Sequence, residues 1–201
     1  MALLERDFFT RPTLTVAREL LGHRLVREIE GQRLSGIIVE TEAYIGPNDT
    51  ASHASKGRTT RTEVMFGPAG YTYVYFIYGV HYMLNLTTEQ PDFPAAVLIR
   101  AIHPQEGVAL MQARRQKPGG VPLKTVTLTN GPGKLCQALE IDSRLNRWDV
   151  TLGQSLWLET GEAVAETLVA TGPRVGVDYA APEDRLAPWR FWVKGEPFVS
   201  K

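Results

Sequence analysis

The stretch YTYVYFIYGVHYMLNLT, residues 71–87, decides how the centre of this chain folds. Residues 71–78 are mostly aromatic or β-branched and strongly favour an extended strand. Gly79 interrupts this run, and residues 81–87 resume it. The pattern predicts a β-hairpin, or a single strand bent sharply at Gly79.

The hydrophobic pattern predicts further strands on both sides of this segment. A helix capped by Thr10 and ending at Gly22 comes first, before two strands over 24–29 and 34–45 that join near Gly31. A long loop is predicted over 46–70, then a strand over 95–102, helices over 104–116 and 131–139, and short strands near 155–159, 164–170, 173–177 and 189–194. Strands and helices do not alternate regularly. We therefore expect one α+β domain, residues 1–201, with a mostly antiparallel sheet.

The composition is that of an ordinary globular protein, with 43% apolar and 22% charged residues in a chain of 201. Lys and Arg number 22, as do Asp and Glu, so the net charge does not indicate a strongly basic nucleic-acid binder. No apolar run approaches the ~20 residues of a membrane span, and the N-terminus has no signal-peptide core. The one cysteine, Cys136, excludes an intrachain disulfide. We expect an intracellular protein with no membrane partner, in the cytoplasm or nucleoid if its source is bacterial.

Metal and thiol chemistry find little support in the sequence. The four histidines show no paired ligand spacing, so no metal site is predicted. Cys136 lies inside a predicted amphipathic helix, where a small buried apolar residue is expected rather than a nucleophile.

The segment Val39–Tyr44, VETEAY, carries two carboxylates on one predicted strand. Alternation places Glu40, Glu42 and Tyr44 on one face and Val39, Thr41 and Ala43 on the other. Paired carboxylates repel each other, and burial would raise at least one pKa, which is typical of acid–base sites. The alternative is an edge strand whose glutamates face solvent.

Aromatic residues of the hairpin suggest a binding wall. Tyr71, Tyr73 and Tyr75 share one predicted face and could line a flat pocket for a planar ligand such as a nucleobase. The alternative is a tyrosine-rich core with hydroxyl groups at its rim. Tyr78, beside the bend, would suit a wedge between base pairs, or it could pack on its own hairpin.

The neutral total charge hides a local excess of basic residues. From Gly107 to Leu139 there are five basic residues and no acidic one, and from Thr50 to Thr62 there are three and none. This pattern indicates a basic face, or charges scattered over a solvated surface. We expect Arg114, Arg115 and Lys134 to contact a DNA backbone, with Lys134 at a helix start suited to one phosphate.

Five motifs together resemble one known family. They are VETEAYIGPNDTASH (39–53), YVYFIYGVHYMLN (73–85), VLIRAIHPQEG (97–107), GPGKLCQAL (131–139) and RVGV (174–177). In order and spacing the chain is similar to the alkyladenine DNA glycosylases, also called 3-methyladenine DNA glycosylases of the alkylpurine type. The resemblance implies a curved antiparallel sheet with a protruding hairpin that enters the DNA minor groove.

The resemblance also implies an activity. It implies a monomeric, monofunctional enzyme of base excision repair, with no cofactor, no metal and no lyase step. Its partner would be double-stranded DNA containing damaged purines. Such an enzyme flips 3-methyladenine or 7-methylguanine, and also hypoxanthine or etheno-adenine, out of the duplex and hydrolyses the N-glycosidic bond.

Site roles follow from the same resemblance. Glu42 matches the base that activates water, Arg100 an arginine that helps hold this water and a nearby phosphate, and the Val175 backbone carbonyl a further water contact. The other matches are Tyr44, His53 and Tyr75, which sandwich the flipped base; Asn85, which rejects the guanine amino group; and Tyr78, the intercalating wedge. Beside the wedge, Val80 and His81 depart from the bulkier methionine and tyrosine of the vertebrate branch. Glu40 has no assigned role.

Two other functions are compatible with these residues. The first is a binding module that flips damaged bases without hydrolysis, for which Glu42 and Arg100 would be unnecessary. The second is a nucleoside or RNA N-glycosidase, which would not depend on duplex DNA.

Overall fold

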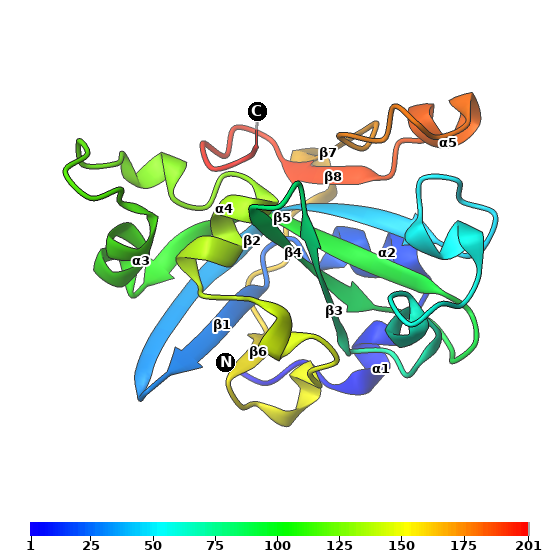
Figure 1. The fold of residues 1–201 in the computed structure, drawn as a ribbon, viewed down its shortest axis with the longest axis horizontal. Helices are drawn as coiled ribbons and strands as arrows, with labels where there is room; N and C mark the ends of the chain where they lie inside the picture. The colour runs from blue at the N-terminus through cyan, green and yellow to red at the C-terminus, as the bar shows by residue number, and fades with distance from the viewer. Residues whose placement is uncertain (201) are drawn as a thin grey trace.

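One curled sheet organises the molecule, as the computed structural model of residues 1–200 shows (Figure 1). Its strand order is β3-β4-β5-β2-β1-β6, and β8 also pairs with β2 and carries β7. Every pairing between these strands is antiparallel. The strands are β1 Arg24–Ile29, β2 Gln32–Ile45, β3 Thr72–Ile77, β4 His81–Thr87, β5 Ala95–Glu106, β6 Leu156–Glu159, β7 Val169–Gly172 and β8 Arg190–Val193. The predicted α+β class and antiparallel sheet are confirmed.

Short helices surround this sheet. Within residues 1–200 they are α1 Arg6–Phe9, α2 Thr13–Glu19, α3 Val108–Arg115, α4 Pro132–Ala138 and α5 Pro182–Leu186, with 3₁₀-helices η1 His53–Lys56, η2 Glu63–Phe66, η3 Thr125–Thr127, η4 Ser143–Leu145, η5 Val150–Leu152 and η6 Glu166–Leu168. In the part of the chain that is described, no helix is long and apolar enough to cross a membrane.

The main core lies where α2 and α4 pack against the sheet. Buried in this core are Val16 of α2, Leu20 at the end of that helix, and Leu135 and Cys136 of α4. The burial expected for Cys136 is confirmed, and burial raises the pKa of its thiol, so the sulfur stays protonated.

The β3–β4 hairpin is a true hairpin and not a bent strand. Val80 N–H donates to the Ile77 carbonyl at 3.2 Å, and Tyr78 and Gly79 between them both have positive φ, at 55° and 67°. Ile77 pairs with His81, so residues 78–80 connect the two strands, and a turn with positive φ at both central residues matches the right-handed twist of these strands. The turn leaves Tyr78 79% exposed and Val80 66% exposed, so the hairpin tip protrudes.

A bulge in β2 changes the predicted alternation. The pairing with β5 shifts register on both sides of Glu40. Thr41 and Ala43 still face the main core, since the Thr41 hydroxyl donates to the Ala17 carbonyl of α2 at 2.6 Å. Val39, predicted to share their face, instead packs in a separate cluster with Phe198. The extra residue that a bulge inserts explains this change of face.

Several local predictions were wrong. The strand expected near 164–170 begins only at Val169, because residues 166–168 form η6. Thr10 ends α1 instead of capping α2, and its hydroxyl donates to the Asp7 carbonyl. Residues 173–177 form no strand. Residues 104–106 continue β5, so the next helix begins only at Val108. The Gly107 that separates them has φ +72°, and a Cβ there would lie 2.8 Å from Leu34 Cγ.

A candidate active site

Glu42 lies at the centre of the site and is completely buried. Its Oε1 accepts a 2.7 Å bond from the Val175 backbone N–H and lies 3.1 Å from Arg100 Nη1. Its Oε2 accepts a 2.9 Å bond from the Tyr44 hydroxyl. The alternative of an exposed edge strand is excluded, because β2 is paired on both sides and Glu40 is also fully buried.

The surroundings of Glu42 set its proton affinity. Burial raises the pKa of this carboxyl, and the positive charge of Arg100 and the donors from Val175 and Tyr44 oppose that rise. The negative charge of Glu40 also raises the pKa of Glu42, by a smaller amount. A carboxylate with a raised pKa takes up a proton more readily than an ordinary glutamate, as a general base requires.

Glu40 binds the other side of Arg100. Its Oε1 accepts 2.7 Å bonds from Arg100 Nε and from Arg190 Nε of β8. Ser200 donates to the same carboxylate through its backbone N–H at 2.6 Å and its hydroxyl at 2.8 Å. The two glutamates of β2 therefore share one buried arginine.

An aromatic wall stands beside this carboxylate. His53, on η1, bonds through Nδ1 to the Tyr73 hydroxyl at 2.9 Å and meets the Tyr75 ring edge-on at 4.7 Å between centroids. Burial, with help from the charges of Arg61 and Lys56, lowers the pKa of His53 to about 4, so this ring is neutral near pH 7.

The tyrosines of β3 differ in their surroundings. Tyr73 is buried in a small cluster of its own with Ala54 and Met65, so the core alternative is correct for this ring. Tyr75 is only partly buried, and the Arg61 guanidinium lies 5.1 Å from its centroid. Asn85 of β4 is buried behind them and donates to the Tyr73 carbonyl at 3.0 Å.

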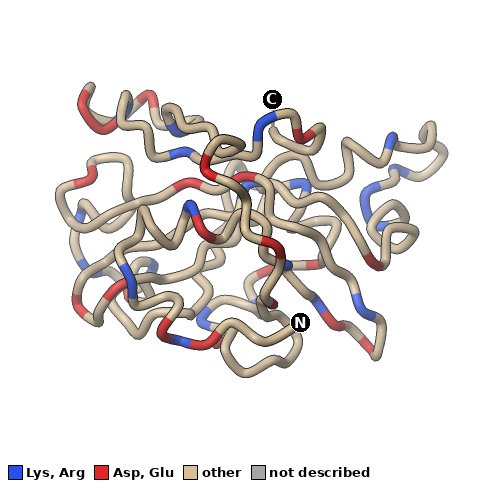
Figure 2. The backbone as a smooth tube through the Cα atoms, turned by 180° about the vertical axis from the view of Figure 1, so that it is seen from behind, with Lys and Arg blue, Asp and Glu red and all other residues tan. Residues whose placement is uncertain are grey.

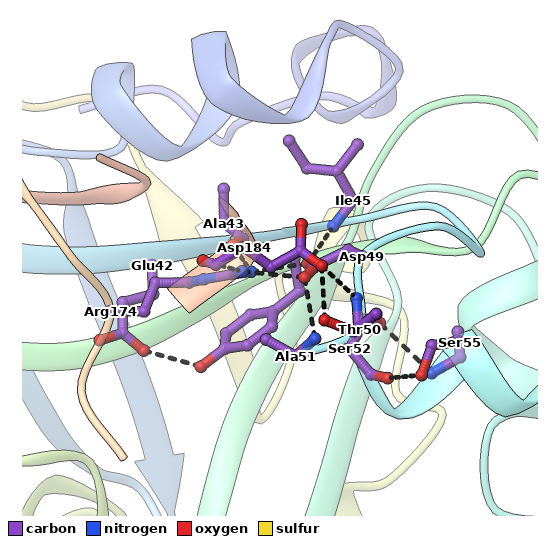
Figure 3. Close-up of polar contacts among 12 residues, drawn as sticks. Glu42, Ala43, Ile45, Asp49, Thr50, Ala51, Ser52, Ser55, Arg174 and Asp184 are labelled. Atoms are coloured by element: carbon purple, nitrogen blue, oxygen red, sulfur yellow. Dashed lines mark hydrogen bonds and ion pairs between the residues drawn. The ribbon is translucent and has the colours of Figure 1, made fainter. Parts of the chain in front are cut away.

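A buried ion pair joins the two loops that carry the site, and no pattern in the sequence predicts it. Arg174 donates to both Asp49 oxygens, at 2.6 and 2.8 Å, and neither side chain is exposed. Asp49 also accepts the backbone N–H of Ile45 and of Ala51, and Figure 3 shows its side chain turned toward both. The Arg174 guanidinium further covers the Tyr44 ring at 4.8 Å. This pair thus brings loop 173–177, and with it Val175, to Glu42.

Helix α4 contacts the β3–β4 hairpin close to its tip. Gly133 of α4 contacts His81 so closely that a Cβ at Gly133 would lie 2.8 Å from His81 Cγ. His81, expected beside the wedge, is the first residue of β4 and is itself exposed, as are Tyr78 and Val80 at the tip.

Comparison with known proteins matches this chain to one family. The family model of the methylpurine-DNA glycosylases matches residues 7–197. Relatives named "Putative 3-methyladenine DNA glycosylase" are 52% identical in Methanocella arvoryzae, over 100% of this chain and 97% of the relative, and 49% identical in Myxococcus xanthus, over 100% and 95%. A third, in Desulfitobacterium hafniense, is 48% identical over 100% of this chain and 99% of the relative.

The chain belongs to the methylpurine-DNA glycosylase family. The resemblance drawn from the five motifs is confirmed, and with it DNA glycosylase activity, a hydrolase reaction, on a DNA substrate. The individual roles of the site residues are proposals, taken up below.

The basic residues expected on the DNA backbone of this glycosylase have partners within the protein. Arg114 Nη2 lies 2.8 Å from Glu140, and Arg115 donates to the Leu128 carbonyl and to Gln137. Lys134 donates to Asn130 at 2.8 Å. Their contact with DNA stays a prediction. Figure 2 shows the basic residues of the segment around α3 gathered at one end of the molecule.

Two further expectations concern groups that already have protein contacts. Arg100 bonds through all three guanidinium nitrogens inside the protein, so its expected contact with a phosphate stays a prediction. Val175 reaches Glu42 through its N–H, whereas the expectation concerned its carbonyl. Among residues 1–200, no three His, Cys, Asp or Glu side chains gather as a metal site would require.

Proposed function

We propose that this glycosylase is monofunctional and acts as a monomer in base excision repair. It flips alkylated purines such as 3-methyladenine and 7-methylguanine from duplex DNA, and also accepts hypoxanthine and etheno-adenine. It then hydrolyses the N-glycosidic bond with water. The observation that carries the proposal is the buried Glu42 carboxylate, held by Arg100, Tyr44 and Val175 beside an aromatic wall.

The proposed reaction uses Glu42 twice. Its carboxylate takes a proton from water while the water oxygen bonds to C1′ of the sugar. The bond from C1′ to the purine nitrogen breaks, and the purine leaves with the electron pair. The sugar passes through an oxocarbenium-like state, whose positive charge the same carboxylate stabilises. An alkylated purine is already cationic and leaves readily, whereas hypoxanthine also needs a proton and is the slower substrate.

The aromatic wall suits selection of a cationic base. Electron-rich rings attract a cation over their faces by roughly 0.5–2 kcal/mol, and Tyr44 and Tyr75 offer such rings. The neutral His53 adds an aromatic surface without a repelling charge. Tyr78, exposed at the hairpin tip, would fill the space in the stack that the flipped base vacates.

The proposed reaction includes no lyase step. A lyase reaction needs an amine that attacks the sugar and forms a Schiff base. The groups bonded to Glu42 are a guanidinium, a phenol and a backbone N–H, and none of them is such an amine.

The Glu42→Gln variant tests the proposal. Gln keeps the shape of the side chain but cannot accept the proton, so base release from a 7-methylguanine duplex should fall at least 100-fold, in the range of general base catalysis, roughly 10²–10⁴. Binding of the same duplex should persist. Glu28→Gln, an exposed change on β1, is the matched control and should retain full activity. Undiminished base release by the Glu42 variant would refute this role.

The two alternatives predict different results in the same assay. A binding module would bind the lesion duplex tightly and release no base in the wild type. A nucleoside N-glycosidase would cleave free 7-methylguanosine as fast as the duplex. The proposed enzyme releases base from the duplex alone and leaves the DNA strand uncut.

A further inference from the structure

Glu40 has no part in the reaction proposed above, yet it is among the most heavily bonded side chains of the molecule. It is fully buried and accepts four hydrogen bonds, from Arg100, from Arg190 and twice from Ser200. A buried charge is costly unless donors compensate it, so this cluster is built around Glu40.

The cluster fixes the direction of Arg100. Its Nε donates to Glu40 at 2.7 Å, and its Nη2 donates to the Ser200 hydroxyl at 3.0 Å. The guanidinium is planar and rigid, so two fixed nitrogens determine the position of the third. That third nitrogen, Nη1, is the one that lies 3.1 Å from Glu42.

We propose that Glu40 and Ser200 are positioning residues for the glycosylase reaction. They orient the Arg100 guanidinium by bonding to its Nε and Nη2, so that Glu42 contacts Nη1 alone and forms no bidentate pair. A carboxylate bonded to two guanidinium nitrogens of one arginine would be a weaker base. The inference rests on the proposed role of Glu42.

The charges around Glu42 give the expected direction of change. Removing the negative charge of Glu40 leaves Glu42 with more of the Arg100 charge, so the pKa of Glu42 should fall. Removing the positive charge of Arg190 leaves Glu40 more negative toward its neighbours, so the pKa of Glu42 should rise. The titratable and charged groups that face Glu42 or its partner Glu40 are Tyr44, Tyr75, Arg100, Arg174, Tyr179 and Arg190.

The test compares Glu40→Gln, Arg190→Gln and Ser200→Ala with the full-length wild type. Single-turnover release of 7-methylguanine from duplex DNA is measured from pH 4 to pH 9. 7-Methylguanine leaves without added protonation, so protonation of the leaving purine does not contribute to the acid limb. The midpoint of this limb should move down by about one pH unit in Glu40→Gln and move up in Arg190→Gln. Ser200→Ala keeps both charges, so it should leave the midpoint in place and lower kcat/KM roughly two- to tenfold.

A readout without catalysis separates this inference from the proposed function. Titration of the Glu42 carboxyl carbon by NMR should show the same opposite shifts in the two charge variants, even if the wild type releases no base. A merely structural cluster would lower the melting temperature and move neither the midpoint nor the carbon titration, and that result would overturn the proposal. If Glu40→Gln does not fold, the Arg190→Gln variant alone tests the proposal: an upward shift of its midpoint supports the proposal, and an unchanged midpoint overturns it.

Discussion

Arg100 Nη1 lies 3.1 Å from Glu42 Oε1, and both side chains are buried. A single arginine on β5 thereby connects two glutamates of β2, because its Nε bonds to Glu40. Glu42, the proposed base, is thus neither isolated in an apolar pocket nor paired with an arginine that it does not share. Its affinity for a proton depends on how one positive charge is divided between two carboxylates.

Asp49→Asn should strongly destabilise the protein. The change leaves the Arg174 charge buried without its partner, which typically costs about 3–5 kcal/mol. It should also loosen loop 173–177 and with it the Val175 bond to Glu42, so base release should fall. Urea unfolding and the release assay measure the two effects. Asp92→Asn, which removes an exposed partner of Arg58, is the control and should leave both nearly unchanged. Equal effects of the two variants would contradict this role of Asp49.

Stability should fall as the pH drops from about 6.5 toward about 4, and His53 should cause part of the loss. Its pKa is lowered from the ordinary 6.5 to about 4 in the folded state. Between these values the unfolded chain binds a proton that the folded chain does not, so acid favours unfolding. Urea unfolding at pH 7 and pH 5 measures the loss. His53→Gln, which cannot take up this proton, should show a smaller loss; an equal one would place the effect elsewhere.

Tyr78→Ala should reduce activity without affecting folding. The ring is 79% exposed, so its removal should leave the melting temperature nearly unchanged. Without the stacked ring, which contributes roughly 1–3 kcal/mol per base, base release from a lesion duplex should weaken about five- to 150-fold under subsaturating conditions. Tyr78→Phe keeps the ring and should remain active. Wild-type activity in the alanine variant would show that the hairpin tip is no wedge.

Salt dependence and stability together should distinguish two groups of basic residues around α3. Lys117 and Lys124 are exposed, so their replacement by Gln should lower the slope of log affinity against log salt by about one for each phosphate that the protein no longer neutralises. Arg114 and Arg115 also have partners within the protein, so their replacement by Ala should reduce stability in addition to lowering the slope. Binding at several salt concentrations, with unfolding curves for each variant, makes the comparison. An unchanged slope in the lysine variants would place the DNA backbone elsewhere.

The sequence by itself determined the hairpin and most of the strands. β-Branched and aromatic residues on both sides of Gly79 favour extended backbone in their own segment. This preference is local, so the sequence alone predicts the two strands. Alternation likewise placed Glu42 and Tyr44 on one face, where they form a hydrogen bond. It failed for Val39, because a bulge depends on the partner strand and not on local preference.

Only the tertiary structure decided how the site is assembled. Asp49 meets Arg174 across 125 positions of sequence, and Val175 meets Glu42 across 133. Ser200 reaches Glu40 from 160 positions away. The local sequence around a charged side chain does not indicate its distant partner. A charge must be paired where it is buried, and its burial is set only once the sheet has formed. The sequence therefore identified Glu42 as the candidate base, whereas the fold decides what holds it in place and how strongly it binds a proton.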